Sequence, residues 1–146
     1  MERILLTTDF SNDAKRAFEQ TQRLAERLGM GITLVHVVID LRTAPQGALL
    51  APALSSPELG DEMTEAKEKL TAMAAEMGSG GVDVKFEVLA GESAAKSIAE
   101  YAKDNDVGMV AISTHGRTGL RHLILGSVAE EVVRHSPVPV VTFPPQ

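Results

Sequence analysis

The chain has 146 residues, 44% of them hydrophobic, which is enough for one domain with its own core and too few for two. Its formal net charge of -6 disfavours broad binding to nucleic acid or anionic membranes, and the lack of cysteine excludes disulfides, cysteine nucleophiles and cysteine-ligated metals. No apolar run is long enough for a signal peptide or a membrane span. We therefore expect a single domain over residues 1–146, in a soluble cytoplasmic protein.

The first third of the sequence predicts a strand, a helix and a second strand. Arg3 to Thr8 is a short apolar run typical of a buried strand. Ser11 then stands at the N-cap of a helix with regularly spaced apolar residues, and Gly29 stands where a helix ends in the left-handed conformation. Gly31 to Val38 is the second strand. The prolines and leucines of residues 41–57 predict an irregular flap that packs against the domain, since a linker would be more polar.

The rest of the chain continues the alternation of helices and strands. In chain order, we predict a helix over 58–77, a strand over 82–89, a helix over 92–104, a strand over 107–112, a helix over 127–135 and a strand over 138–143. Such alternation is typical of a parallel sheet with crossover helices, and right-handed crossovers favour a doubly wound α/β fold. The periodicity leaves the order of the strands open. The strand over 107–112 is apolar on both faces, which indicates an interior position.

Polar residues follow the first and the fourth predicted strands. The first stretch is Thr7-Thr8-Asp9, and the second, after the fourth strand, is Ser113-Thr114-His115-Gly116. Ligands of open α/β sheets bind outside the carboxyl ends of the strands, where the winding reverses. If these two strands are neighbours, both polar stretches open into one crevice.

The stretch after the fourth strand has the composition of an anion-binding loop. It leads through Arg117, Arg121 and His122 to Gly126 and the start of a helix, and helix N-termini bind phosphate through free N–H groups. Between residues 107 and 129 there is no Asp or Glu to cancel the positive charge. A purely structural interpretation also exists, in which Gly126 is a turn residue and Ser127 forms a capping box with the glutamate at position 130.

The spacing of this loop carries a resemblance to a known family. The sequence reads Ser113-x2-Gly116-x9-Gly126-Ser127, whereas the ATP-binding members of the universal stress protein family carry G-x2-G-x9-G-[S/T] after their fourth strand. The chain resembles that family over nearly its whole length, the flap excepted. Further similarities are Thr8-Asp9-Phe10-Ser11, His36 to Asp40, Gly91 and Ser136 to Val140.

The resemblance implies a three-layer, Rossmann-like α/β fold (adenine nucleotide alpha hydrolase-like), with a five-stranded parallel sheet in the order 3-2-1-4-5 and ATP at the switch between the first and fourth strands. The loop would cradle the phosphates and ribose, and Asp9 and Val37 would lie on the adenine or ribose side. The implied nucleotide-binding residues are Thr8, Asp9, Val37, Ser113, His115, Gly116, Arg117, Gly119, Gly126, Ser127 and Val128. Asp9 is the nearest candidate ligand for a magnesium ion that accompanies ATP. Ser113 replaces the first motif glycine, and its hydroxyl can crowd the sugar or donate a hydrogen bond to it.

The last strand, over residues 138–143, predicts a homodimer. A terminal apolar strand at a sheet edge leaves its backbone unpaired unless a second copy pairs with it, and the resemblance implies the same dimer.

Other chemistries have weaker support in the sequence. Asp9, His36 and Ser11 could form a catalytic trio on paper, but no G-x-S-x-G motif is present, and His36 is better explained as a hydrogen-bonded core residue. The patterns of P-loop NTPases and dinucleotide dehydrogenases are also absent. Three hypotheses follow: an ATP-binding homodimeric regulator of the stress response, a dimeric interaction module without nucleotide affinity, and a slow ATPase or adenylate-transferring enzyme.

Overall fold

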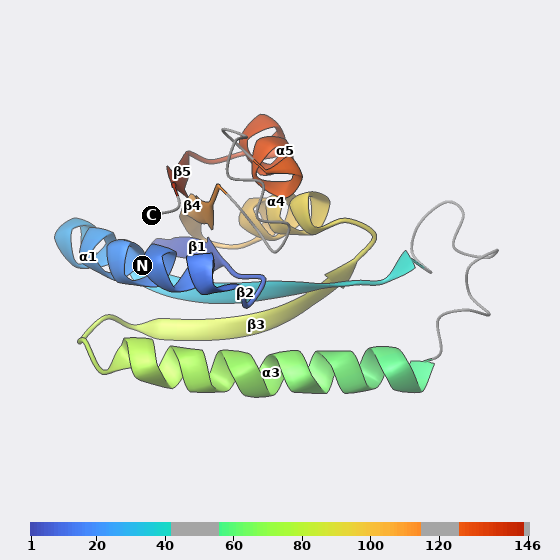
Figure 1. Cartoon of the computed structure of the whole chain (residues 1–146). Coiled ribbons are helices and arrows are strands. Elements are labelled where there is room, and N and C mark those ends of the chain that lie inside the picture. The colour runs from blue at the N-terminus through green and yellow to red at the C-terminus, as the bar shows by residue number, and fades with distance from the viewer. Residues whose placement is uncertain (42–55, 115–125, 145–146) are drawn as a thin grey trace.

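A computed structural model of the chain describes residues 1–41, 56–114 and 126–144. Five strands form one parallel sheet in the order β3-β2-β1-β4-β5, which confirms the order implied by the resemblance (Figure 1). The strands are β1 (Arg3–Thr7), β2 (Gly31–Ile39), β3 (Val84–Gly91), β4 (Val107–Ser113) and β5 (Val140–Phe143). The winding reverses between β1 and β4, which are hydrogen-bonded neighbours.

Helices cover both faces of the sheet, so the domain has three layers (Figure 1). One face carries α1 (Asn12–Leu28) and α3 (Ser56–Gly78), and the other carries α4 (Ala94–Asp104) and α5 (Ser127–His135). Among the described residues, no helix is long and apolar enough to cross a membrane. The predicted doubly wound α/β fold is confirmed.

The central strand β1 serves both cores. Ile4 and Leu6 point to the face of α1 and α3, while Leu5 points to the face of α4 and α5, and all three side chains are fully buried. Successive side chains of a strand point to opposite faces, so an apolar run can fill two cores at once. Burial of each such side chain stabilises the fold by about 1.5–3 kcal/mol.

Two strands begin later than predicted. The third strand starts at Val84 rather than at residue 82, and it extends to Gly91 because its register with β2 continues to that residue. The fifth strand starts at Val140 rather than at residue 138. The hydroxyl of Ser136 accepts from the N–H of Val138 at 3.2 Å and donates to its carbonyl at 2.7 Å, which ties this residue into a turn instead.

The helix ends agree only in part with the predicted caps. Gly29 ends α1 in the left-handed conformation, with φ at 66°, as predicted. Ser11 occupies the N-cap position of α1, but its side chain makes no capping hydrogen bond. The capping box predicted at Ser127 is wrong, because Gly126 is the N-cap of α5 and Ser127 is already its first helical residue.

Candidate functional site

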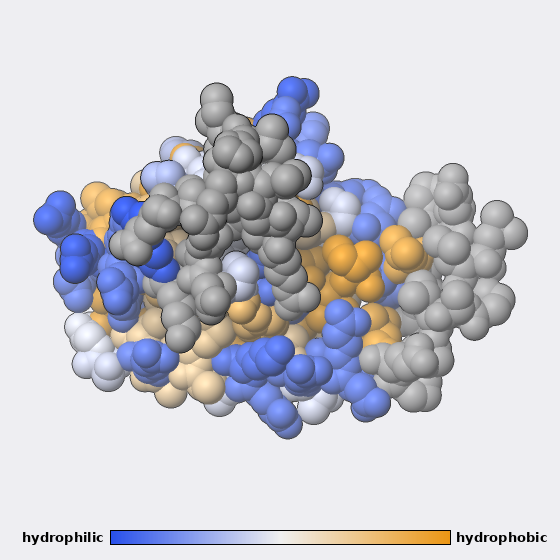
Figure 2. All heavy atoms as spheres, viewed as in Figure 1, coloured by the Kyte–Doolittle hydropathy of each residue, from blue (hydrophilic) through white to orange (hydrophobic). Residues whose placement is uncertain are grey.

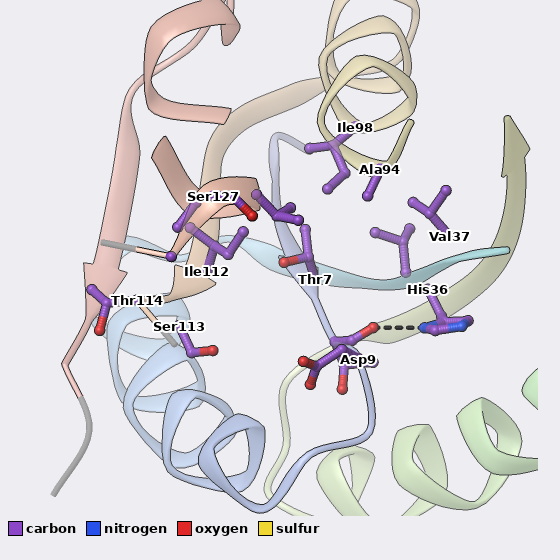
Figure 3. Close-up of a pocket in the computed structure, with 15 residues that line it drawn as sticks. Thr7, Asp9, His36, Val37, Ala94, Ile98, Ile112, Ser113, Thr114 and Ser127 are labelled. Atoms are coloured by element: carbon purple, nitrogen blue, oxygen red, sulfur yellow. Dashed lines mark hydrogen bonds between the residues drawn. The ribbon is translucent and has the colours of Figure 1, made fainter. Parts of the chain in front are cut away.

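A cavity opens at the carboxyl ends of β1, β2 and β4, on the side of the sheet covered by α4 and α5 (Figure 3). It has a volume of about 240 Å³, just below the roughly 300–1,000 Å³ of typical small-molecule sites. It can therefore enclose a small organic group. Its position is the reversal point of the winding, where open α/β sheets bind ligands.

Seven residues predicted from the sequence line this cavity. They come from segments far apart in the chain, namely Thr8, Asp9, Val37, Ser113, Gly126, Ser127 and Val128. The other four predicted residues, His115, Gly116, Arg117 and Gly119, lie outside the described residues, as does most of the predicted flap. Every predicted site residue that the structure describes therefore lines this cavity.

Sequence reasoning missed the apolar wall of the cavity. The missed lining residues are Val35, His36, Ala94, Ile98, Ile112 and Ala129, whereas Thr7 and Thr114, which also line the cavity, belong to the polar stretches expected at this crevice. Ala94 and Ile98 project from the first turns of α4, a helix that carries no family motif (Figure 3). Position alone could have found them, because a helix that follows an inner strand of such a sheet begins near its ligand-binding edge.

The turn after β1 is shaped by its own side chains. The Thr8 hydroxyl accepts from the N–H of Phe10 at 3.0 Å, and Asp9 Oδ1 accepts from the N–H of Ser11 at 2.9 Å. Phe10 has a φ of 65°, a left-handed conformation that is unfavourable for a residue with a Cβ. The two side-chain hydrogen bonds offset that cost and hold Asp9 at the mouth of the cavity.

His36 braces the same turn and has no catalytic arrangement. Its Nδ1–H donates to the Thr8 carbonyl oxygen at 2.8 Å, which must be the acceptor because a carbonyl carries no proton (Figure 3). Its ring lies 4.3 Å from the ring of Phe10, and the ammonium of Lys69 lies 5.0 Å from the centre of that ring. Among the described residues, the buried Ser11 hydroxyl has no hydrogen-bond partner, so it does not pair with His36. The predicted hydrogen-bonded role of His36 is confirmed, although the side chain is only half-buried.

Two helix N-termini border the cavity. Ala94 is the first residue of α4, whose N-cap Ser93 accepts from the N–H of Lys96 at 3.1 Å, and Gly126 caps α5. Both helices direct the positive ends of their dipoles to this edge of the sheet. Among the described lining residues, Asp9 alone carries a carboxylate. The site therefore suits a ligand that combines an apolar body with negative charge.

The backbone of Gly126 does not need glycine for its conformation. Its φ of -68° and ψ of 163° are open to any L-residue. Its N–H donates to the Thr114 carbonyl at 2.6 Å, and Thr114 in turn donates its N–H to Phe143 at 3.0 Å, which anchors the start of α5 to β5. A glycine has no Cβ, so it lets a ligand come closer to the backbone than any other residue would.

Comparisons with known proteins identify the family. The model of the universal stress protein family matches residues 1–144. The chain is 32% identical to universal stress protein MJ0531 of Methanocaldococcus jannaschii, over 98% of this chain and 83% of that protein. The chain belongs to the universal stress protein family.

Solved structures of the family share the fold. Universal stress protein UspA from Lactobacillus plantarum has a TM-score of 0.80 and 25% identity, with 97% of each chain covered. The universal stress protein from Archaeoglobus fulgidus in complex with dAMP has a TM-score of 0.67 and 21% identity, again with 97% of each chain covered. At that identity the second comparison shows the fold alone.

Proposed function

We propose that the chain binds an adenine nucleotide, ATP, in the cavity at the switch between β1 and β4. The observation that carries the proposal is the convergence of seven predicted residues on one cavity that an apolar wall and two helix N-termini complete. The fold of the Archaeoglobus fulgidus protein, whose complex holds dAMP, supports the adenine part of the proposal.

Each part of the cavity suits one part of the nucleotide. Val37, Ala94 and Ile98 form an apolar wall suited to a base. Ser127 and Val128, at the start of α5, offer backbone N–H groups, and Ser127 adds a hydroxyl, both suited to phosphate oxygens. Asp9, held by the Ser11 N–H through one oxygen, is placed to accept from a ribose hydroxyl or to ligate the accompanying magnesium ion.

Thermal unfolding with and without ATP and magnesium tests the proposal. At 100 times its dissociation constant, a ligand that binds only the folded chain stabilises it by about 2.7 kcal/mol. For a domain of this size that raises the melting temperature by roughly 5–10 °C. Retained nucleotide is also visible in the ultraviolet absorbance of the purified chain, because the protein contains one Tyr and no Trp.

A glycine-to-valine pair separates binding from stability. Gly126→Val keeps an allowed backbone conformation but fills the space beside the start of α5, so the shift caused by ATP should disappear. Gly78→Val is the matched control, because no atom lies within 4 Å of the position of its added Cβ and it is remote from the cavity. Its ATP shift should equal that of the unmodified chain. A Gly126→Val variant that still responds fully to ATP contradicts the proposed site.

The proposed role is regulatory: a homodimeric, nucleotide-dependent module of the stress response rather than a metabolic enzyme, located in the cytoplasm. The dimer would form through β5, an edge strand that pairs only with β4 within the described part of the chain. Sedimentation at micromolar concentration should show a dimer, and a clean monomer contradicts this part of the proposal. A chain that forms a dimer but shows no thermal shift with ATP would instead be the interaction module without nucleotide affinity. Ser113, in place of the first motif glycine, is the reason for considering that alternative.

A further inference from the structure

The opposite edge of the sheet, β3, carries a pattern that matches itself in reverse. Its central residues read Val84-Lys85-Phe86-Glu87-Val88. When two copies of this segment pair antiparallel with Phe86 opposite Phe86, Val84 of one copy lies opposite Val88 of the other. Lys85 of one copy then lies opposite Glu87 of the other. Apolar residues therefore meet apolar residues, and each charge meets its opposite.

The backbone N–H and C=O groups on the outer edge of β3 fit that register. The N–H of Ile32 donates to Asp83 O and the N–H of Asp40 donates to Gly91 O, so the odd-numbered residues of β3 direct their backbone groups to β2. The even-numbered residues between them direct theirs to the outer edge. Within the described part of the chain, β3 pairs with β2 alone. A second β3 centred on Phe86 meets these free groups, since every hydrogen-bonded pair joins two even-numbered residues.

The side chains on the two faces of β3 fit the same pairing. Lys85 and Glu87 are exposed on the face of α4, where Glu87 accepts from the Tyr101 hydroxyl at 3.0 Å. They fall at the non-hydrogen-bonded positions of the pairing, where opposite residues lie closest, about 4.5 Å between Cα atoms. On the face of α3, Phe86 and Val88 are half-buried beside a hollow that a second copy would cover.

The flank of α3 beside this edge carries a glycine, two threonines and one lysine. Thr64 and Lys67 line the hollow next to β3, and Gly60 and Thr71 follow on the same side at helical spacing. Gly60 is exposed inside the helix with no atom within 4 Å of an added Cβ, so nothing within the described chain requires a glycine there.

The other flank of α3 is highly charged. It faces α1 and carries the exposed charges of Glu62, Glu65, Lys69 and Glu76, and Figure 2 shows hydrophilic side chains over much of α3. An antiparallel pairing of two β3 strands brings the two α3 helices to the same face of the joined sheet, with the flanks that carry Gly60 and Thr64 toward each other. Repulsion between the two acidic flanks is thereby avoided.

We propose that β3 pairs antiparallel with β3 of a second copy of this chain, centred on Phe86, with Lys85 of each copy against Glu87 of the other. Charges on edge strands usually keep other strands away. Here the charges of Lys85 and Glu87 favour a second copy of β3 over other strands, because a strand without the reversed pattern meets mismatched charges. The interface lies at the opposite end of the sheet from β5 and does not depend on nucleotide binding.

Disulfide trapping tests the register directly, because the chain contains no cysteine of its own. A Lys85→Cys variant mixed with a Glu87→Cys variant should form a mixed disulfide several-fold faster than either variant alone, since residue 85 faces residue 87 of the second copy and not its own equivalent. The expected separation of about 4.5 Å between Cα atoms suits a disulfide. Lys103→Cys, exposed on α4, mixed with Lys85→Cys gives the rate of random collision. A mixture that reacts no faster than this control overturns the proposal and leaves the edge to another partner.

Charge exchange gives a second test. Because the β3 pairing adds to the dimer through β5, sedimentation at raised protein concentration should show assemblies larger than a dimer. Lys85→Glu and Glu87→Lys should each form fewer of these assemblies than the unmodified chain, because each places like charges opposite one another. Mixing the two variants should restore association, and so should the double variant. Tyr101→Phe controls for the lost contact of Glu87. Association that is unaffected by the single changes, or not restored by mixing, overturns the proposal.

Discussion

Replacing Thr21 by valine should make the protein more stable. Thr21 lies in α1, its side chain is fully buried, and its hydroxyl has no hydrogen-bond partner among the residues that the structure describes. Threonines in helices commonly bond the carbonyl four residues earlier, as Thr64 and Thr71 of α3 do at 2.9 and 2.7 Å. The hydroxyl of Thr21 has therefore left water without compensation.

The size of the effect follows from that missing bond. An unsatisfied buried polar group costs about 1–3 kcal/mol. Valine has nearly the shape of threonine and a similar helix propensity, so little else changes. We expect Thr21→Val to stabilise the fold by about 1–2 kcal/mol and to raise the melting temperature by roughly 3–6 °C.

Urea unfolding measures this free energy, and two variants serve as controls. Thr21→Ser keeps the hydroxyl and removes the buried methyl group, so it should destabilise by about 1 kcal/mol. Thr71→Val changes an exposed residue and should stay within about 0.5 kcal/mol of the unmodified chain. If Thr21→Val is less stable than the unmodified chain, the hydroxyl has a partner in solution and the reasoning is wrong.

Two further predictions concern pH. The hydrogen bond and charge of Arg3 hold the pKa of Asp83 below its ordinary value of 3.8, so the stability that this pair contributes is present above pH 3.8 and is lost as the pH falls through the lower, folded-state pKa. The difference in unfolding free energy between the unmodified chain and Asp83→Asn should therefore be constant near neutrality and shrink in acid; a difference that grows in acid contradicts this sign. Burial, and then the hydrogen bond to Glu87, raise the pKa of Tyr101 from 10.0 to about 12, so its contribution to stability is present below pH 10 and is lost as the pH rises through the folded-state value. Absorbance of the phenolate of this single tyrosine should show a midpoint near 12 in the folded chain and near 10 in denaturant, with Tyr101→Phe as the blank.

Local patterns were sufficient for the elements and for part of the site. The apolar run of β1, the periodicity of α1 and the glycine at position 29 are each read from neighbouring residues, and the structure confirms them. The motif spacing likewise selected Gly126 and Ser127, which line the cavity. Errors arose where a local signal competed with another, as at Ser127, where a plausible cap gave way to Gly126 one residue earlier.

What the sequence by itself determined is the alternation of strands and helices, their approximate limits, and the loop whose resemblance implied the family and the strand order. Only the tertiary structure decided which distant residues share a surface. Three features carry no local signal: the apolar wall from Ala94 and Ile98, and, within residues 1–41, 56–114 and 126–144, the unpartnered hydroxyl of Thr21 and the unpaired edge of β3. The physical reason is that periodicity reports which face of an element is buried, whereas contacts between elements depend on how all of them pack together.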